Sequence, residues 1–369
     1  MSNDSYDIEL ITESAQKLFS REFGLEFIRR YQETGEAEKK SLIRQCLEMG
    51  WQGLIIDETA GGFGFGLEAL CALLEELGKA AFPTLYFSHF VAPPLLLNKL
   101  GSTELRTSLL AAMAVGEQLP VVAADSSSME SFCGENGIRA SKTNEGFELS
   151  GQVDFLCDLD SATVLLVPAL TAEGSMVLHA IAPDLEGVEI APRPDKSYGS
   201  TFTLDLNKVQ VDSGCLLELN SRIPLQQTYR LCAVAKSAEM IGGAERAMKI
   251  ALEYVMVRKQ FGKLLAEFQA VQHQAADMYK VVDIARLFVK DALEQLDGGD
   301  EPDLLAHYCK SWANDACFEA CSTSHQLMGG TGYMTETDLQ LLSAQVLRNQ
   351  YEFGSSDYHR EIVGKSLGL

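Results

Sequence analysis

Basic residues are scarce in this sequence. It has 30 lysines and arginines against 52 aspartates and glutamates, which gives a formal net charge of −22 and an isoelectric point near 4.7. This balance argues against bulk electrostatic binding to nucleic acid or to an anionic membrane surface. A cofactor that carries phosphate would need local positive charge, so individual arginines and lysines within motifs are informative here.

Long hydrophobic runs are also absent. The longest apolar stretches, such as 163–170, are too short to cross a bilayer, which takes about 20 residues. The first five residues, Met-Ser-Asn-Asp-Ser, are polar and acidic and begin no signal peptide. We therefore expect a soluble, cytoplasmic protein without a membrane span.

The cysteines lack any pairing pattern. The nine cysteines are scattered, without a Cys-x-x-Cys pair or a Cys/His cluster at zinc-ligand spacing. Cys317 and Cys321 are four residues apart, which places both on one face of a helix and favours packing over ligation. The pattern is typical of reduced thiols in a cytoplasm and predicts no metal site.

The spacing of apolar residues divides the 369-residue chain into three regions. In residues 1–117 they recur at steps of three and four, which predicts helices. Between 118 and 220, short β-branched and aliphatic runs alternate with turn clusters, which predicts an antiparallel β domain. From 221 to 369 the helical period returns in long segments, which is typical of a bundle. The expected fold class is therefore α+β.

A basic segment precedes a glycine turn at 258–263, Arg-Lys-Gln-Phe-Gly-Lys. Arg258 and Lys259 could bind a diphosphate, because arginine makes charge-assisted and often bidentate contacts to phosphate oxygens. The alternative is a solvated helix end, where basic side chains meet the helix dipole and Gly262 supplies the cap. The residues alone favour the helix end.

Two glycine-rich segments could each be either a ligand-binding loop or a structural turn. Residues 61–66, Gly-Gly-Phe-Gly-Phe-Gly, lack the ending of a P-loop, which predicts a structural turn. Residues 326–333, Gln-Leu-Met-Gly-Gly-Thr-Gly-Tyr, contain three glycines that permit close approach of a ligand. Because this segment follows a helix rather than a strand, a helix-terminating turn is favoured.

The C-terminal tail contains a candidate general base. Glu352 lies in the segment 351–360, Tyr-Glu-Phe-Gly-Ser-Ser-Asp-Tyr-His-Arg. A carboxylate in a partly apolar setting can act as a base, although a surface carboxylate is the commoner case. His359 is expected on a helix face rather than in catalysis.

Taken in order, these segments resemble the acyl-CoA dehydrogenase family along nearly the whole chain. Residues 49–64, Met-Gly-Trp-Gln-Gly-Leu-Ile-Ile-Asp-Glu-Thr-Ala-Gly-Gly-Phe-Gly, and 74–78, Leu-Glu-Glu-Leu-Gly, look like its N-terminal helical signature. Arg-Lys-Gln-Phe-Gly at 258–262, with Phe268 and Gln269, is similar to its most specific motif. Gln-Leu-Met-Gly-Gly-Thr-Gly at 326–332 is similar to the next.

The resemblance implies an N-terminal helical domain, a middle β domain and a C-terminal four-helix bundle, with FAD bound across a subunit interface. By analogy, Arg258, Lys259 and Gln260 contact the diphosphate and adenosine end of the flavin in a neighbouring subunit. The further residues implied at FAD sites are Phe261, Phe268, Gln269, Gln326, Leu327, Met328, Gly329, Gly330, Ser355, Ser356, Phe155 and Cys157.

The resemblance also implies a reaction. In the family, a glutamate removes the α-proton of an acyl-CoA thioester while hydride passes from the β-carbon to the flavin, giving a 2-enoyl-CoA. Electrons then pass to an electron-transfer flavoprotein. The expected setting is fatty acid or sterol side-chain catabolism, in a homo- or hetero-oligomer. A desolvated carboxylate suits the proton step, since burial raises its pKa.

Two segments of the middle region depart from the family pattern. Where the family has Leu/Val-Thr-Glu-Pro-x-x-Gly-Ser, residues 122–128 read Val-Ala-Ala-Asp-Ser-Ser-Ser, without the threonine, proline or glycine. The family's Trp-Ile-Thr/Ser strand is matched by Phe155, Leu156 and Cys157, which keep an aromatic ring and lose the hydroxyl.

The third departure concerns the base. Alignment of the tail puts Phe353 where the family's glutamate is usual and displaces Glu352 by one residue. Some family members place the glutamate early in the first bundle helix, a position that falls here at or near Cys232. Glu239, further along that helix, is the second candidate base. Packing beside the glycines at 242–243 is an equally supported role for it.

The half-site that this chain lends to a neighbour is thus intact, while its own half-site is eroded. The family includes bacterial heteromeric enzymes in which one subunit keeps the base and another completes the flavin site, and this sequence is similar to the second kind. The alternatives are a homomeric enzyme with Glu352 or Glu239 as base, and a catalytically silent structural or regulatory homologue that binds acyl-CoA.

Overall fold

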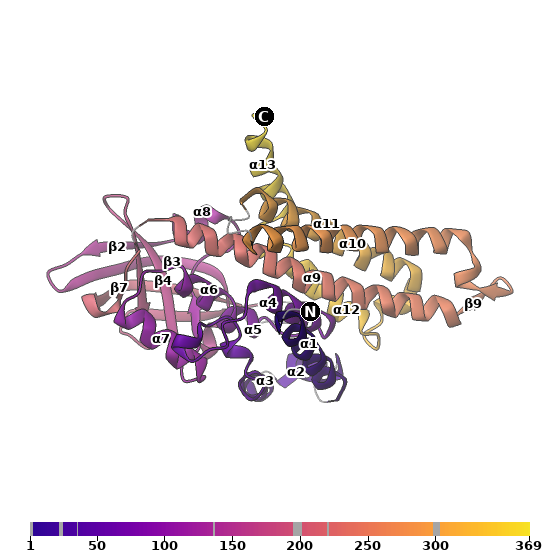
Figure 1. Cartoon of the computed structure of the whole chain (residues 1–369), viewed down its shortest axis with the longest axis horizontal. Coiled ribbons are helices and arrows are strands. Elements are labelled where there is room, and N and C mark those ends of the chain that lie inside the picture. Colours follow the sequence, from indigo (N-terminus) through magenta and orange to yellow (C-terminus); the bar gives the residue numbers. More distant parts are fainter. Residues whose placement is uncertain are drawn as a thin grey trace. The chain divides into compact units, whose positions relative to one another are not determined.

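Two compact units make up the chain in the computed structural model (Figure 1). The bundle unit comprises Met1–Glu33, Leu67–Phe82 and Ala233–Leu369, and the sheet unit comprises Thr34–Gly66 and Pro83–Cys232. The structure describes residues 3–21, 25–34, 36–135, 137–194, 201–219, 221–297 and 303–369. The helices expected in 1–117 divide between the two units, and the three-domain boundaries at 117 and 220 stay a prediction.

Long helices form the bundle unit, as the sequence predicts. They are α1 (Asn3–Arg21), α2 (Leu25–Thr34), α4 (Leu67–Lys79), the part of α9 (Ile223–Val257) from Ala233 onward, α10 (Gln269–Asp297), α11 (Asp303–Met328), α12 (Leu339–Asn349) and α13 (Ser356–Ser366). On α10, the buried residues Met278, Val282, Ala285, Val289 and Ala292 recur at steps of four and three. Such a stripe faces a neighbouring helix, and α10 lies alongside α11 (Figure 1).

Glycines let α4 and α9 approach to backbone contact. A Cβ added at Gly242 of α9 would lie 1.9 Å from the carbonyl oxygen of Glu75, and one added at Gly78 of α4 would lie 2.0 Å from that of Glu239. No side chain larger than hydrogen fits at either position. This close crossing fixes where the middle of α9, which carries Glu239, lies within the bundle unit.

The sheet unit has helices around one sheet. The helices are α3 (Glu36–Glu48), α5 (Leu85–Phe90), α6 (Ala92–Asn98), α7 (Glu104–Ala114) and α8 (Met129–Phe132). The strands are β1 (Pro120–Val122), β2 (Ile138–Lys142), β3 (Gly146–Cys157), β4 (Val164–Thr171), β5 (Met176–Ile181), β6 (Val188–Arg193), β7 (Thr201–Asp212) and β8 (Leu216–Leu217). Their order is β6-β7-β3-β2-β4-β5-β8, with β1 also paired to β4.

The sheet is mixed rather than purely antiparallel, which corrects one expectation. β1 pairs in parallel with 164–166 of β4, and β2 pairs in parallel with 169–171 of the same strand. β1 and β2 therefore lie one after the other along the same edge of β4. The chain runs in the same direction in both strands, before and after the short helix α8. The other pairings are antiparallel, and β3 and β7 are 12 residues long.

Alternation along β7 shows where the sheet core lies. Leu204, Leu206, Val209 and Val211 are buried, whereas the residues between them are mostly exposed. A strand with one buried face follows a period of two, and the step of three between Leu206 and Val209 falls where the pairing of β3 with β7 shifts register. These residues join a hydrophobic cluster with Ile138, Leu149 and Leu165.

The glycine-rich segment 61–66 is a structural turn, as predicted. Its amide groups are used within the turn: the N–H groups of Gly62, Phe63, Gly64 and Phe65 donate to backbone carbonyls of residues 53–57. A Cβ at Gly62 would lie 2.1 Å from the carbonyl oxygen of Ile56. These amides are therefore not available to cradle a phosphate.

Among the described helices, none combines the length and the apolar composition that a membrane span requires.

The α4–α9 crossing predicts a specific stability effect. Gly242→Ala should lower the free energy of unfolding by about 2 kcal/mol or more, because the added methyl overlaps the Glu75 carbonyl. Gly364→Ala is the matched control, since it lies in α13 with nothing within 4 Å of its added Cβ. It should be neutral or stabilising by up to about 1 kcal/mol. Urea denaturation measures the free energy of unfolding of both variants. Equal changes in Gly242→Ala and Gly364→Ala would contradict the close backbone contact between α4 and α9.

Candidate functional site

A two-stranded hairpin follows the end of α9. β9 (Lys259–Gln260) pairs with β10 (Lys263–Leu264), and the two residues between them, Phe261 and Gly262, have φ of 54° and 82°. Positive φ at both central residues is the conformation of a tight hairpin turn. α9 ends at Val257, before the basic residues, so Gly262 turns a hairpin rather than capping a helix.

The hairpin carries unpaired positive charge. Arg258, Lys259 and Gln260 are exposed, and neither Arg258 nor Lys259 forms an ion pair with any residue that the structure describes. Phe261 is 92% exposed, and its ring meets that of Phe268 edge to face at 6.4 Å. On a chain of net charge −22, the hairpin is therefore a local concentration of positive charge.

The second glycine-rich segment lies beside the last turns of α9. α11 ends at Met328, and residues Gly329–Tyr333 form a 3₁₀ helix. The Tyr254 and Thr331 hydroxyl oxygens are 3.5 Å apart, so this segment lies beside the last turn of α9, which leads into the hairpin. A Cβ at Gly329 or Gly330 would have nothing within 4 Å, so their backbone faces open space.

The side chains of the expected FAD residues in this segment differ in exposure. Gln326 and Gln269 are exposed and face solvent, whereas the side chains of Leu327 and Met328 are buried, at 8% and 6% exposure. Leu327 and Met328 therefore anchor the end of α11 and leave only their backbone for contact with a ligand.

Ser355 and Ser356 are engaged at the start of α13. The Oγ of Ser355 accepts a hydrogen bond from the Tyr358 N–H at 3.3 Å, which caps the helix. The Oγ of Ser356 donates to Asp315 Oδ1 at 2.7 Å.

The turn between α12 and α13 is held from several sides. Phe353 is buried and has φ of 55°, an uncommon conformation for a residue with a side chain. Its carbonyl oxygen accepts from Nε2 of His359 at 2.8 Å, and the Gly354 carbonyl accepts from Asn314 Nδ2 at 3.1 Å. Lys310 donates to the Asn349 carbonyl at 2.8 Å. These contacts fix the backbone of the segment that contains Glu352.

His359 is on a buried face of α13. Its Nε2 donates to a carbonyl, so Nδ1 accepts from Nδ1 of His307, 2.7 Å away. Burial, and then the nearby charge of Lys310 and the His307 ring, lower the pKa of His359 to about 3. His359 is therefore neutral at physiological pH.

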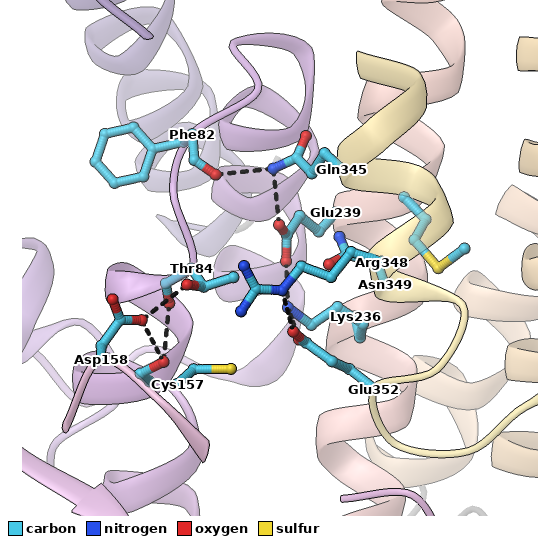
Figure 2. A network of polar contacts seen from close by, with 12 residues as sticks. Phe82, Thr84, Cys157, Asp158, Lys236, Glu239, Gln345, Arg348, Asn349 and Glu352 are labelled. Carbon is cyan, nitrogen blue, oxygen red and sulfur yellow. Dashed lines mark hydrogen bonds and ion pairs between the residues drawn. The ribbon is translucent and has the colours of Figure 1, made fainter. Parts of the chain in front are cut away.

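Lys236 joins the two candidate bases (Figure 2). Its fully buried Nζ is 2.8 Å from Glu239 Oε2 and 3.0 Å from Glu352 Oε2. Arg348 Nε donates to the other oxygen of Glu352 at 2.9 Å. Gln345 Nε2 donates to Glu239 Oε1 at 3.0 Å and to the Phe82 carbonyl at 2.8 Å. We call Lys236, Glu239, Gln345, Arg348 and Glu352 the Lys236 cluster.

The cluster determines the protonation of Glu352. Burial by itself would raise the pKa of Glu352, but the charges and hydrogen bonds of Lys236 and Arg348 outweigh it and lower the pKa to about 2. Burial would lower the pKa of Lys236, but Glu239 and Glu352 more than compensate and raise it. Both partners are therefore ionised at neutral pH, and Glu352 is a weak base.

One signal for this cluster is present in the sequence, outside the family motifs. Lys236 lies among apolar residues of α9 and three residues before Glu239, the spacing of an ion pair on one helix face. A charged residue in such a run needs a buried partner. Glu352, Arg348 and Gln345 could not be assigned to it, because they are far away in the sequence.

In the sheet unit, Phe155 and Cys157 lie at the end of β3. Phe155 has φ of 60° and is 69% exposed, with the guanidinium carbon of Arg193 4.8 Å from its ring centre. Asp158 follows and is fully buried, where it accepts from Thr84 Oγ1 at 2.8 Å (Figure 2) and pairs with Lys39 at 3.0 Å. The strand end that presents Phe155 is therefore fixed.

A cavity of about 240 Å³ adjoins Phe155 and the 122–128 segment. Its lining includes Ala123, Ala124, Asp125 and Asp154. Both the N–H and the hydroxyl of Ser127 donate to the carboxylate of Asp125 at 2.8 Å, so that hydroxyl is engaged within the turn. At 123–125, where the family pattern would provide a threonine hydroxyl, the cavity is lined by two alanines and Asp125, and its polar lining elsewhere includes Ser131 and Gln152.

All nine cysteines are free thiols, and Cys317 and Cys321 are buried in the bundle unit, which confirms their predicted packing role.

Comparisons with known proteins agree with these motifs. Residues 5–117 match the model of the N-terminal domain of acyl-CoA dehydrogenases, and residues 230–368 match that of the C-terminal domain. The probable acyl-CoA dehydrogenase YngJ of Bacillus subtilis is 26% identical over 348 residues, 91% of each chain.

Solved structures with the same fold include the ChsE4-ChsE5 complex of Mycobacterium tuberculosis. It has a TM-score of 0.88 and 23% identity and covers 100% of this chain and 98% of that one. PigA with FAD and proline has a TM-score of 0.89 and 20% identity, with coverage of 100% and 98%.

His359 predicts a pH dependence of stability. Its pKa is about 3 in the folded protein and about 6.5 when unfolded. A depressed folded pKa contributes stability above pH 6.5 that is lost as pH falls toward 3. Between pH 6 and pH 5, the free energy of unfolding should therefore fall by about 1 kcal/mol more in the wild type than in His359→Gln.

Urea denaturation at pH 7, 6 and 5 measures this difference. His273→Gln, at an exposed position of α10, is the control and should keep the wild-type slope. Parallel curves for the wild type and His359→Gln would show that the buried histidine does not take up this proton.

Proposed function

Since this chain belongs to the acyl-CoA dehydrogenase family, whose members are FAD-dependent oxidoreductases acting on CH–CH groups, we propose that it is a subunit of a heteromeric enzyme. In this proposal it completes the flavin site of a second subunit that supplies the base. The reaction is the desaturation of an acyl-CoA to a 2-enoyl-CoA in the cytoplasm, with an electron-transfer flavoprotein as acceptor. The observation that carries the proposal is the contrast between the unpaired cations of the hairpin and the fully paired carboxylates of the Lys236 cluster.

The hairpin fits the phosphate end of FAD. Arg258 and Lys259 are exposed and unpaired within the described residues, and the backbone at Gly329 and Gly330 is open to close approach. Charge-assisted contacts from arginine suit a diphosphate. When bound, FAD supplies the hydride acceptor. This chain's part is to hold its phosphates by Arg258, Lys259 and the exposed amides of Gln260 and Gln326.

The sheet unit fits an isoalloxazine less well. Ala123 and Ala124 offer methyl groups, and the nearby Ser127 hydroxyl already donates to Asp125. Phe155 provides an exposed aromatic face but no hydroxyl follows it at Cys157. The half-site that this chain would build for itself therefore lacks the side-chain donors of the family pattern.

The candidate positions within the described residues also offer no suitable base. Phe353 is apolar, and a carboxylate with a pKa of about 2 is poorly matched to proton abstraction near neutral pH. We therefore assign Glu352 a structural rather than a catalytic role. We assign the same role to Glu239, because its two oxygens are bound by Lys236 and Gln345. The ChsE4-ChsE5 complex, which has the same fold, supports a heteromeric arrangement by analogy.

The proposal is tested by purifying this chain alone and together with a second subunit. Expressed alone, the chain should hold little FAD and show negligible dehydrogenase activity. Co-expressed with a second family member encoded beside it, the complex should be yellow and active with acyl-CoA. The visible absorption spectrum and dye reduction measure both. A yellow, active homo-oligomer would refute the proposal, and absence of flavin under both conditions would favour the silent homologue.

Arg258 predicts a loss of flavin in that complex. Arg258→Ala should weaken FAD binding by roughly 10- to 100-fold, since a hydrogen bond to a charged group contributes about 1.5–3 kcal/mol. Arg258→Lys should restore part of the affinity. Lys290→Ala, at an exposed position of α10, is the matched control. Fluorescence titration of the apo-complex with FAD measures the affinities, and an unchanged affinity in Arg258→Ala would exclude this contact.

A further inference from the structure

All four oxygens of the two candidate bases are occupied by protein donors. Lys236 binds one oxygen of Glu239 and one of Glu352, at 2.8 and 3.0 Å. Gln345 binds the second oxygen of Glu239 and Arg348 the second oxygen of Glu352, at 3.0 and 2.9 Å. A general base must direct a lone pair at the proton that it removes, within hydrogen-bond reach. In these two carboxylates every oxygen already accepts from a positively charged or amide donor of the protein, which weakens it as a proton acceptor.

The charges of the cluster cancel. Lys236 and Arg348 supply two positive charges, and Glu239 and Glu352 supply two negative charges. The Lys236 side chain is 0% exposed, and those of Glu239 and Arg348 are 5% and 11% exposed. A buried cluster of this kind is stable only while each charge keeps its partner, because a single unpaired charge carries the full desolvation cost. Moving either carboxylate toward a substrate would leave Lys236 without it.

Lys236 is the member that both carboxylates share. Arg348 contacts Glu352 and Gln345 contacts Glu239, whereas the Lys236 ammonium lies within 3.0 Å of an oxygen of each carboxylate. Lys310 of α11 lies near the cluster: burial, and then the charge of Lys236, lower its pKa to about 7 although Glu352 acts in the opposite direction, and its donors are directed to Asn314 and the Asn349 carbonyl. The middle of α9 thus holds the tail through one side chain.

We propose that Lys236 is a positioning residue that withholds Glu239 and Glu352 from catalysis by fixing both carboxylates in ion pairs, so that neither serves as a base toward an acyl-CoA. The inference rests on the proposed function in that it explains why the chain's own half-site is silent. It is a property of this chain alone, however, and its test requires neither flavin nor a second subunit.

The test is a titration of Glu352 in the isolated full-length chain. The protein is labelled with ¹³C at the glutamate side-chain carboxyl, and the signal that Glu352→Gln removes is followed with pH by NMR. In Lys236→Met, Glu352 should titrate about 1–3 units higher than in the wild type, because an opposite charge at this distance lowers a carboxyl pKa by that amount. Lys236→Arg keeps the charge and should retain most of the low value.

A second pair of variants keeps the cluster neutral in case the single replacement unfolds the chain. Lys236→Met/Glu239→Gln removes one charge of each sign and leaves Arg348 paired with Glu352. It is compared with Glu239→Gln, which retains Lys236. Glu352 should titrate about 1–3 units higher in the double variant than in Glu239→Gln. Lys39→Met removes another buried lysine, paired with Asp158 in the sheet unit, and should leave the Glu352 titration unchanged.

The outcomes are distinct. A raised Glu352 titration in both Lys236→Met variants, and not in Lys39→Met, supports the proposal. An unchanged titration in folded Lys236→Met/Glu239→Gln overturns it, whatever the oligomer and flavin content of the wild type. Conversely, a flavin-loaded homo-oligomer would reject the heteromeric role without deciding the titration, so that the two proposals fail separately.

Discussion

The buried ammonium group of Lys236 links the middle of α9 to the C-terminal tail of the bundle unit. Lys236 projects from the middle of α9, which is fixed against α4 by the backbone contacts at Gly78 and Gly242. From there it binds Glu239 on its own helix and Glu352 in the tail. The desolvation of so many charges is tolerable only because they are mutually neutral and hydrogen-bonded. The position of the Glu352 carboxylate thus depends on the electrostatic balance around Lys236.

The same balance explains the strained turn after α12. Phe353 adopts a positive φ that costs free energy for any residue with a Cβ. It persists because His359, Asn314 and Lys310 bind the carbonyl groups around it, while Lys236 and Arg348 hold the neighbouring carboxylate. The turn is rigid by virtue of polar contacts from four helices, and it presents an apolar ring at position 353.

The bundle unit therefore has two polar regions of opposite character. In one, the hairpin exposes Arg258, Lys259 and Phe261 without partners for the two charges among the described residues. In the other, every carboxylate of the Lys236 cluster accepts from donors of the cluster itself. The charges of Arg258 and Lys259 are available to a binding partner, whereas those of Glu239 and Glu352 are already neutralised within the cluster. This asymmetry favours a contribution to a neighbour's flavin over a complete site of the chain's own.

Local order could be predicted from the residue pattern alone: the helical periods, the strand region, the structural turn at 61–66 and the motifs that identify the family. Each depends on residues close together in the chain, where spacing and turn chemistry act directly. The parallel pairing of β1 and β2 with β4, the hairpin at Gly262, and the burial of Leu327 and Met328 emerged only from the folded chain. So did the partners of Lys236, because the Coulomb interaction depends on distance through space, which sequence spacing does not report once the chain has folded back on itself.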